Sequence, residues 1–155
     1  MPSIRSTISK LSQDFPDYTF ESADSFWWSA TKQTIFYDPK AANSDAFTLH
    51  ELSHAILDHK GYTRDIELLK LERDAWAFAT TKLAKDYRVT IQPTIVQDNL
   101  DTYREWLHAR STCPECETTG LQSKGQLYRC LACGHRWQVN EARLCALRRY
   151  SLQTK

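Results

Sequence analysis

The sequence predicts an α+β chain, in which a small domain of helices and a short β-hairpin is followed by a module held by four cysteines. Three observations support this class: an H-E-x-x-H pattern in a helix-like segment at residues 50–54, two β-prone runs before it, and two C-x-x-C pairs near the carboxyl end. We expect residues 1–110 to form the main domain, 111–140 the module and 141–155 a basic helix or tail. A chain of 155 residues is long enough for one modest core and such a module.

The amino-terminal part is expected to form one short helix and then a hairpin. Scattered apolar residues within residues 1–25 suffice for one amphipathic helix. The β-prone residues 26–28 and 34–37 flank a polar stretch, which favours a hairpin. Asp38-Pro39 ends the second strand, and the Asn, Ser and Asp of residues 43–45 offer N-cap side chains for the next helix.

That helix is expected to run to about Lys60, where Gly61 suits the left-handed position after a helix. Its apolar stripe would consist of Leu49, Leu52 and Ile56, which recur at helical spacing. The stripe should face the core of the domain.

A second helix is expected from about residue 63 to residue 86, again with an apolar face at helical spacing. Glu72 lies in the middle of this face, and an isolated buried carboxylate is costly unless it is paired or bound to a metal. Residues 87–97 are expected to be extended or loop-like, and a further helix should reach roughly Leu107.

The H-E-x-x-H pattern predicts a metal site. His50 and His54 lie one helical turn apart, so both can direct an imidazole nitrogen at one ion, and Glu51 can act as a general base beside it. A zinc site with one open corner takes three protein ligands, so the third should come from a neighbouring helix. Glu72 is the best candidate because of its place on an apolar face, and Asp74 is the runner-up.

His59 is another residue of a metal-binding type, five positions after His54. A continuous helix would rotate it away from the face that carries His50 and His54. We therefore interpret His59 as lying outside the ligand shell or on the surface.

Two blocks of sequence resemble the ImmA/IrrE family of metallopeptidases. They are Ala46-Phe-Thr-Leu-His-Glu-Leu-Ser-His54 and Glu72-x-x-Ala-x-x-Phe-Ala79. Residues 34–37 also resemble that family's strand before its active-site helix, and the resemblance covers roughly residues 26–86. Trp76 stands where the family often has asparagine, a departure that leaves the ligands intact but changes the packing near them.

The resemblance implies a zincin-like, zinc-dependent endopeptidase. Carried over to this sequence, the zinc ligands of that family correspond to His50, His54 and Glu72, and its general base corresponds to Glu51. The implied substrate is a protein, a helix-turn-helix repressor or an antitoxin-like regulator. A donor for the oxyanion is also expected, and three side chains are candidates: Tyr37, His59 and Tyr62.

The four closely spaced cysteines predict a second, structural zinc site. Cys113 and Cys116 form one C-x-x-C pair, and Cys130 and Cys133 form the other. Two such pairs are typical of a closed tetrahedral site, and the segment resembles a zinc ribbon. His135 could replace one cysteine, but four cysteines already complete the shell.

We expect the zinc ribbon to have a structural role, and the alternative is that it contacts nucleic acid. A redox-active dithiol agrees less well with the cysteine pattern. Residues 111–155 carry seven Lys/Arg against three Asp/Glu, within a chain of net charge +1. This mild excess is far from the dense basic patch of a nucleic-acid-binding protein. Cys145 stands outside the site and is expected to be an incidental thiol.

Composition favours a cytoplasmic protein without membrane contact. No apolar run approaches the roughly 20 residues of a membrane span, and residues 1–13 lack the apolar centre of a secretory signal. In such a chain, paired cysteines indicate a metal more often than a disulfide.

Two other functions compete with the peptidase hypothesis. A SprT-like protease also joins H-E-x-x-H to a zinc ribbon and acts on DNA-associated proteins, but it would require a histidine as the third ligand. A non-catalytic regulator that binds protein or nucleic acid could keep both zinc ions without hydrolysing anything.

Overall fold

The computed structural model describes residues 3–140 and 149–152. Within these residues the chain is α+β, with helices and two small sheets, as the sequence predicts. Its internal contacts divide it into two compact units: residues 1–60 with 71–96, and residues 61–70 with 97–155. The three-part division with boundaries after residues 110 and 140 stays a prediction.

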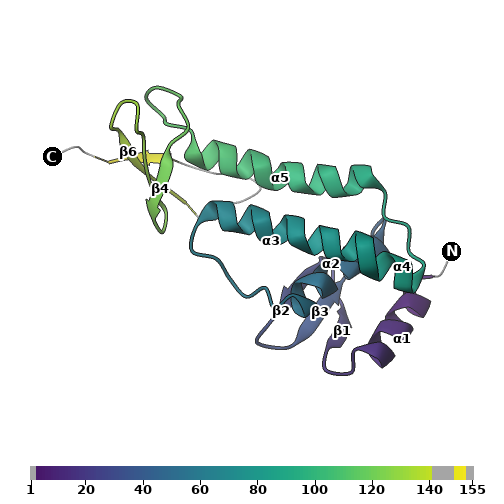
Figure 1. Ribbon diagram of the computed structural model, residues 1–155. Helices are drawn as coiled ribbons and strands as arrows, with labels where there is room; N and C mark the ends of the chain where they lie inside the picture. Colours follow the sequence, from purple (N-terminus) through teal and green to yellow (C-terminus); the bar gives the residue numbers. More distant parts are fainter. Residues whose placement is uncertain (1–2, 141–148, 153–155) are drawn as a thin grey trace. The chain divides into compact units, whose positions relative to one another are not determined.

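The first unit contains a three-stranded sheet, against which helix α2 packs (Figure 1). Strands β2 (Trp27–Ser29) and β3 (Thr34–Tyr37) pair antiparallel, which confirms the expected hairpin. Strand β1 (Thr19–Ser22) pairs parallel to β3 at the other side and was not predicted. Its residues are mostly exposed, so it lacks the alternation of apolar and polar residues that identifies a strand in a sequence.

Helix α1 (Ile4–Asp14) confirms the predicted amino-terminal helix. It begins after Ser3, whose hydroxyl oxygen accepts a hydrogen bond from the Ser6 amide at 3.2 Å. Leu11 of this helix is fully buried in the core of the first unit. The other buried members of that core come from β3, α2, the helical segment after residue 71 and the residues that follow it: Ile35, Leu49, Leu52, Ala55, Ala79, Leu83 and Val89.

Helix α2 (Ser44–Ile56) ends four residues earlier than expected. Leu57 caps it, and Asp58 takes the left-handed conformation with φ of 58°. The predicted role of Gly61 is therefore wrong, because the chain turns at Asp58, a residue type that tolerates this conformation better than most. The apolar stripe stops at Ile56, so nothing buried would hold a further turn of helix.

Helix α3 (Asp65–Phe78), a π-helical segment (Ala79–Leu83) and α4 (Ala84–Tyr87) form one helical run, as predicted for residues 63–86. Helix α5 (Pro93–Ser111) is longer than predicted. It starts at Pro93, a residue that suits the first turn because that turn needs no amide donor. The expectation of a loop to residue 97 is thus wrong. Among the described residues, no helix is long and apolar enough to cross a membrane.

The second unit contains an antiparallel sheet in the order β4-β5-β6-β7. Its strands are β4 (Leu121–Lys124), β5 (Leu127–Arg129), β6 (Arg136–Val139) and β7 (Arg149–Ser151). A basic helix or tail is expected over residues 141–155. Residues 141–148, including Cys145, and residues 153–155 lie outside the described residues, and residues 149–151 form a strand rather than a helix.

Candidate metal centres

Helix α2 and helix α3 bring two imidazoles and one carboxylate together in the first unit. The Nε2 atom of His50 lies 2.8 Å from Oε2 of Glu72, and Nε2 of His54 lies 3.3 Å from the same oxygen. The two Nε2 atoms are 3.2 Å apart. All three residues are buried, so the predicted third ligand faces both histidines across the helix pair.

These separations fit the donor set of a zinc ion. Ligand atoms that each lie at about 2.0–2.1 Å from zinc in a tetrahedral arrangement are about 3.3 Å from one another. Two imidazole nitrogens and a carboxylate oxygen are also ligand types that zinc prefers. The ligand atoms of His50, Glu51 and His54 lie within 4.8 Å of one another, so a second carboxylate stands beside the cluster.

The electrostatics of the cluster favour an ionised carboxylate. Burial alone would raise the pKa of Glu72, but its hydrogen bonds and charge interactions with His50 and His54 hold that pKa well below its ordinary value. Burial would also lower the pKa of His54, yet the hydrogen bond and charge of Glu72, with the charge of Glu51, raise it overall. The buried site is therefore anionic at Glu72, which suits a divalent cation.

Asp74, the alternative third ligand, occupies a different environment. Its carboxylate lies 3.9 Å from Nε of Arg73, and the Asp74 side chain is 44% exposed. Glu72 rather than Asp74 is thus the acidic side chain of α3 that meets the histidines.

Trp76 packs directly on the first histidine. Its ring stacks on the His50 imidazole, with centroids 4.1 Å apart and an interplanar angle of 16°, and the Trp76 side chain is buried. Phe47 contacts the Trp76 ring in turn, edge to face. The tryptophan at this position therefore restricts the orientation of His50 by packing.

His59 lies against the second histidine, because α2 ends early. Its Nδ1 atom is 2.9 Å from Nδ1 of His54, and the centroids of the two rings are 5.1 Å apart. Burial and the charge of His54 lower the pKa of His59. The helix ends before His59, so the expected rotation away from His54 is wrong, but the ring lies against the outer nitrogen of His54 and agrees with the expectation that His59 lies outside the ligand shell. Among the three oxyanion candidates, His59 is thus the one with a direct hydrogen bond to the cluster.

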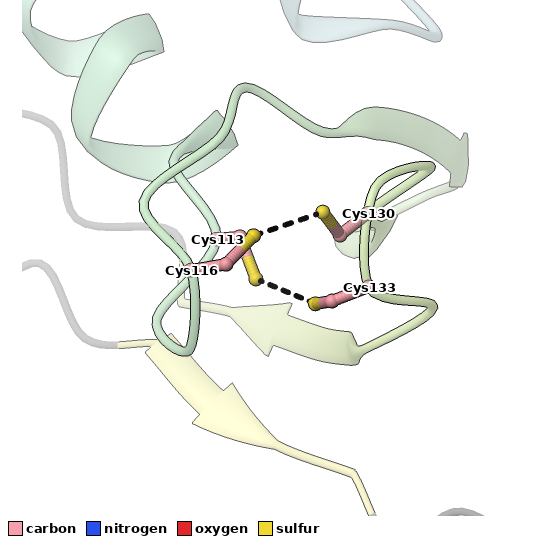
Figure 2. A group of neighbouring side chains, drawn as sticks. All are labelled: Cys113, Cys116, Cys130 and Cys133. Atoms are coloured by element: carbon pink, nitrogen blue, oxygen red, sulfur yellow. Dashed lines mark hydrogen bonds between the residues drawn. The ribbon is translucent and has the colours of Figure 1, made fainter.

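The four cysteines of the second unit converge as predicted (Figure 2). Sγ of Cys113 lies 3.7 Å from Sγ of Cys133, and Sγ of Cys116 lies 3.5 Å from Sγ of Cys130. Four thiolates at about 2.3 Å from a tetrahedral zinc would be about 3.8 Å apart, so the sulfur positions fit that ion.

The two C-x-x-C segments have the same backbone geometry. In each, the amide four residues after the first cysteine donates to that cysteine's carbonyl at 3.0 Å, from Glu117 to Cys113 and from Gly134 to Cys130. Glu117 and Gly134 both have positive φ, of 63° and 78°. Hydrogen bonds from Thr118 and neighbouring thiols hold the pKa of Cys116 below its usual value, whereas the backbone hydrogen bond from His135 is outweighed by burial and the other three thiols, which raise the pKa of Cys133.

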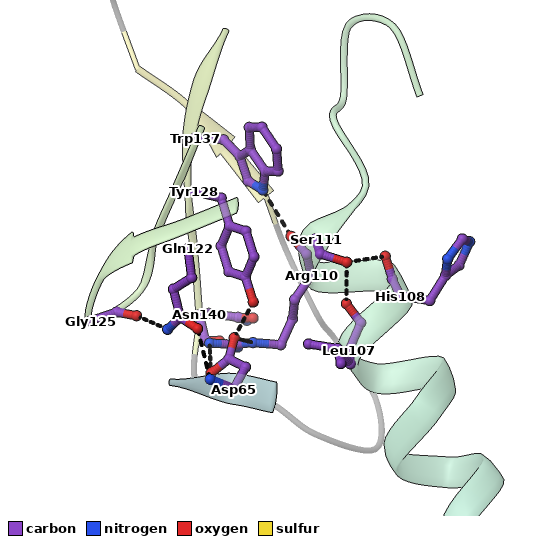
Figure 3. A network of polar contacts seen from close by, with 10 residues as sticks. All are labelled: Asp65, Leu107, His108, Arg110, Ser111, Gln122, Gly125, Tyr128, Trp137 and Asn140. Atoms are coloured by element: carbon purple, nitrogen blue, oxygen red, sulfur yellow. Dashed lines mark hydrogen bonds and ion pairs between the residues drawn. The ribbon is translucent and has the colours of Figure 1, made fainter. Parts of the chain in front are cut away.

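A buried ion pair connects α3, α5 and the ribbon within the second unit (Figure 3). Nε of Arg110 donates to Oδ2 of Asp65 at 2.7 Å, and both side chains are only 4% exposed. The Tyr128 hydroxyl donates to the same oxygen at 2.6 Å, while the Trp137 indole donates to the Arg110 carbonyl at 2.9 Å. Arg110 also donates to the carbonyl of Asn140.

Sequence reasoning missed this network. Asp65 lies near the expected start of a helix, and its partner lies 45 positions away. A basic residue at the end of a helix, such as Arg110, has a ready local explanation in the helix dipole. No local pattern therefore indicates that the two side chains are buried together.

Comparisons of the chain with protein-family models, with curated proteins and with solved structures find no match. The inference of function therefore depends on the geometry of the two clusters.

Proposed function

We propose that this chain is a zinc-dependent endopeptidase that hydrolyses a peptide bond in a transcriptional repressor or an antitoxin-like regulator. The observation that carries the proposal is the convergence of ligand atoms from His50, His54 and Glu72. A zinc ion bound there supplies Lewis acidity, which polarises a scissile carbonyl and makes water more acidic.

Glu51 is the residue that would move protons. It follows His50 on α2, is half-buried, and its carboxylate lies in the same group of ligand atoms. A carboxylate in this place would take a proton from the attacking water and later deliver one to the leaving amine. Glu72 would complete the ligand set, so Glu51 would act as the base rather than as a ligand.

The substrate class rests on the resemblance of residues 46–54 and 72–79 to the ImmA/IrrE family. The ribbon is assigned a structural zinc, because the second unit has a small core: Cys113, Tyr128, Cys130, Trp137 and Val139. So small a core needs a metal or an equivalent constraint to be stable. Contact of the ribbon with nucleic acid is a secondary element of the proposal.

The SprT-like alternative is less well supported. It requires a histidine as the third ligand, whereas among the described residues the side chain that meets both His50 and His54 through Nε2 contacts is Glu72. Proteolysis stimulated by DNA would nevertheless favour that alternative.

The proposal is tested by substituting Glu51→Gln, which keeps the shape of the side chain and removes its basicity. The variant should retain fold and zinc but lose cleavage, and cells that carry it should accumulate the uncut substrate in comparative proteomics. Glu105→Gln, which makes the same change at an exposed carboxylate on α5, is the matched control and should remain active. Full activity of Glu51→Gln in its biological assay would instead identify a non-catalytic zinc-binding regulator.

A further inference from the structure

The segment after α2 folds back onto the metal cluster of the first unit. The His59 amide donates to the His54 carbonyl at 2.9 Å, and the Asp58 amide donates to the Ala55 carbonyl at 3.1 Å. With Asp58 in the left-handed conformation, this turn fixes the backbone of His59 beside the last turn of the helix. The place of the His59 ring is therefore set by backbone hydrogen bonds as well as by its own side chain.

The two nitrogens of His54 face different partners. Nε2 faces Oε2 of Glu72 at 3.3 Å and Nε2 of His50 at 3.2 Å, whereas Nδ1 faces Nδ1 of His59 at 2.9 Å. An imidazole that binds a metal through Nε2 must carry its proton on Nδ1, and a buried N–H needs an acceptor. The atom within hydrogen-bond distance is Nδ1 of His59.

We propose that His59 is a positioning residue, whose Nδ1 accepts a hydrogen bond from Nδ1–H of His54 and thereby keeps the Nε2 lone pair of His54 directed at the metal. This inference rests on the metal site of the proposed function. For Nδ1 of His59 to accept, its own proton must lie on Nε2. The His54 ring is thus fixed in both tautomer and orientation by one hydrogen bond.

His50 provides an internal contrast. Its Nδ1 atom is buried and has no hydrogen-bond partner within the described part of the chain, while its ring stacks on Trp76. The first histidine is therefore oriented by packing and the second by a hydrogen bond. Removal of the acceptor at residue 59 should act on His54 and leave the stacked His50 ring in place.

The test measures metal binding rather than catalysis. In the full chain with zinc already in the ribbon, cobalt(II) is titrated into the first site of the wild type, His59→Leu and His59→Asn. Leucine removes the acceptor, whereas the amide oxygen of asparagine occupies nearly the position of the histidine Nδ1. His108→Leu, at an exposed position of the second unit, is the control. Circular dichroism and retained ribbon zinc report the fold.

His59→Leu should weaken cobalt binding about 10- to 100-fold, the usual effect of losing an outer hydrogen-bond partner of a ligand. His59→Asn should restore most of the affinity and the visible cobalt spectrum, and nitrogen NMR of His54 should show the Nδ1–H form in the zinc-loaded wild type and in His59→Asn. Equal cobalt affinity of His59→Leu and the wild type would overturn the inference and leave the proposed function intact. The same conclusion would follow if His59→Leu and His59→Asn lost cobalt affinity equally while the fold was preserved. Absence of a second metal in the wild type would overturn both.

Discussion

Asp65→Ala should destabilise the second unit, because it leaves the Arg110 guanidinium buried without its counterion. Both side chains are 4% exposed, so solvent screens the pair little. Breaking a buried ion pair by removing one partner costs about 3–5 kcal/mol. The Tyr128 hydroxyl loses its acceptor in the same variant, but this loss involves the same carboxylate and is not added separately. We therefore expect a loss of about 3–5 kcal/mol.

The assay is native-state hydrogen exchange of amides in the ribbon, measured on zinc-saturated protein. The Cys130 and Val139 amides are suitable probes because each donates a hydrogen bond within the second unit. Their exchange reports the free energy of opening that unit, independently of the first one. Equilibrium unfolding in urea serves as a second measurement.

Asp74→Ala is the matched control, since it removes an exposed carboxylate whose ion pair with Arg73 is long, at 3.9 Å. Such surface pairs contribute about 0–1 kcal/mol. The double variant Asp65→Leu/Arg110→Met removes both charges and should cost less than Asp65→Ala alone. The reasoning fails if Asp65→Ala is no worse than Asp74→Ala, or if the double variant is the least stable of all.

Two further outcomes follow from the geometry of the sites. Glu72→Ala should remove one zinc ion and leave the ribbon zinc bound, whereas Cys130→Ser should release the ribbon zinc and unfold that module without emptying the first site. Metal analysis of the purified variants measures both effects, and loss of both ions from either variant would contradict the prediction. Gly120→Ala should destabilise the second unit by about 1–3 kcal/mol, because the added Cβ would lie 2.4 Å from the Trp137 ring and 2.8 Å from the Arg129 carbonyl oxygen. Thermal unfolding measures this loss of stability. An unchanged midpoint would show that the ring moves away freely.

The local parts of the fold could be predicted from the sequence. Helical spacing located α1, α2 and the helical run that begins at Asp65, and two β-prone runs around a polar stretch located the hairpin of β2 and β3. Glu72 was identified because a carboxylate on an apolar face needs a partner, and the structure places it beside two histidines. In each case the informative residues lie within a few turns or one hairpin of one another.

The features that were missed depend on contacts between distant residues or on where a helix stops. Strand β1 pairs parallel with β3, so its register is set by a neighbour about fifteen positions further on rather than by its own exposed residues. The place of His59 depends on α2 ending at Ile56, and helix ends are less well determined by spacing than helix centres. The Asp65–Arg110 pair joins positions too far apart for any local pattern.

The two candidate metal centres differ in the same way, and the difference explains which of their residues a sequence can indicate. Each cysteine pair is held by hydrogen bonds within its own short segment, so the spacing of the cysteines already contains the geometry. In the other centre the spacing supplies only His50 and His54. The third candidate ligand comes from another helix, and the side chains that contact the rings, Trp76 by stacking and His59 by a hydrogen bond, have no fixed spacing to the motif. Substitutions at these two positions should consequently alter the first site while the H-E-x-x-H motif remains unchanged.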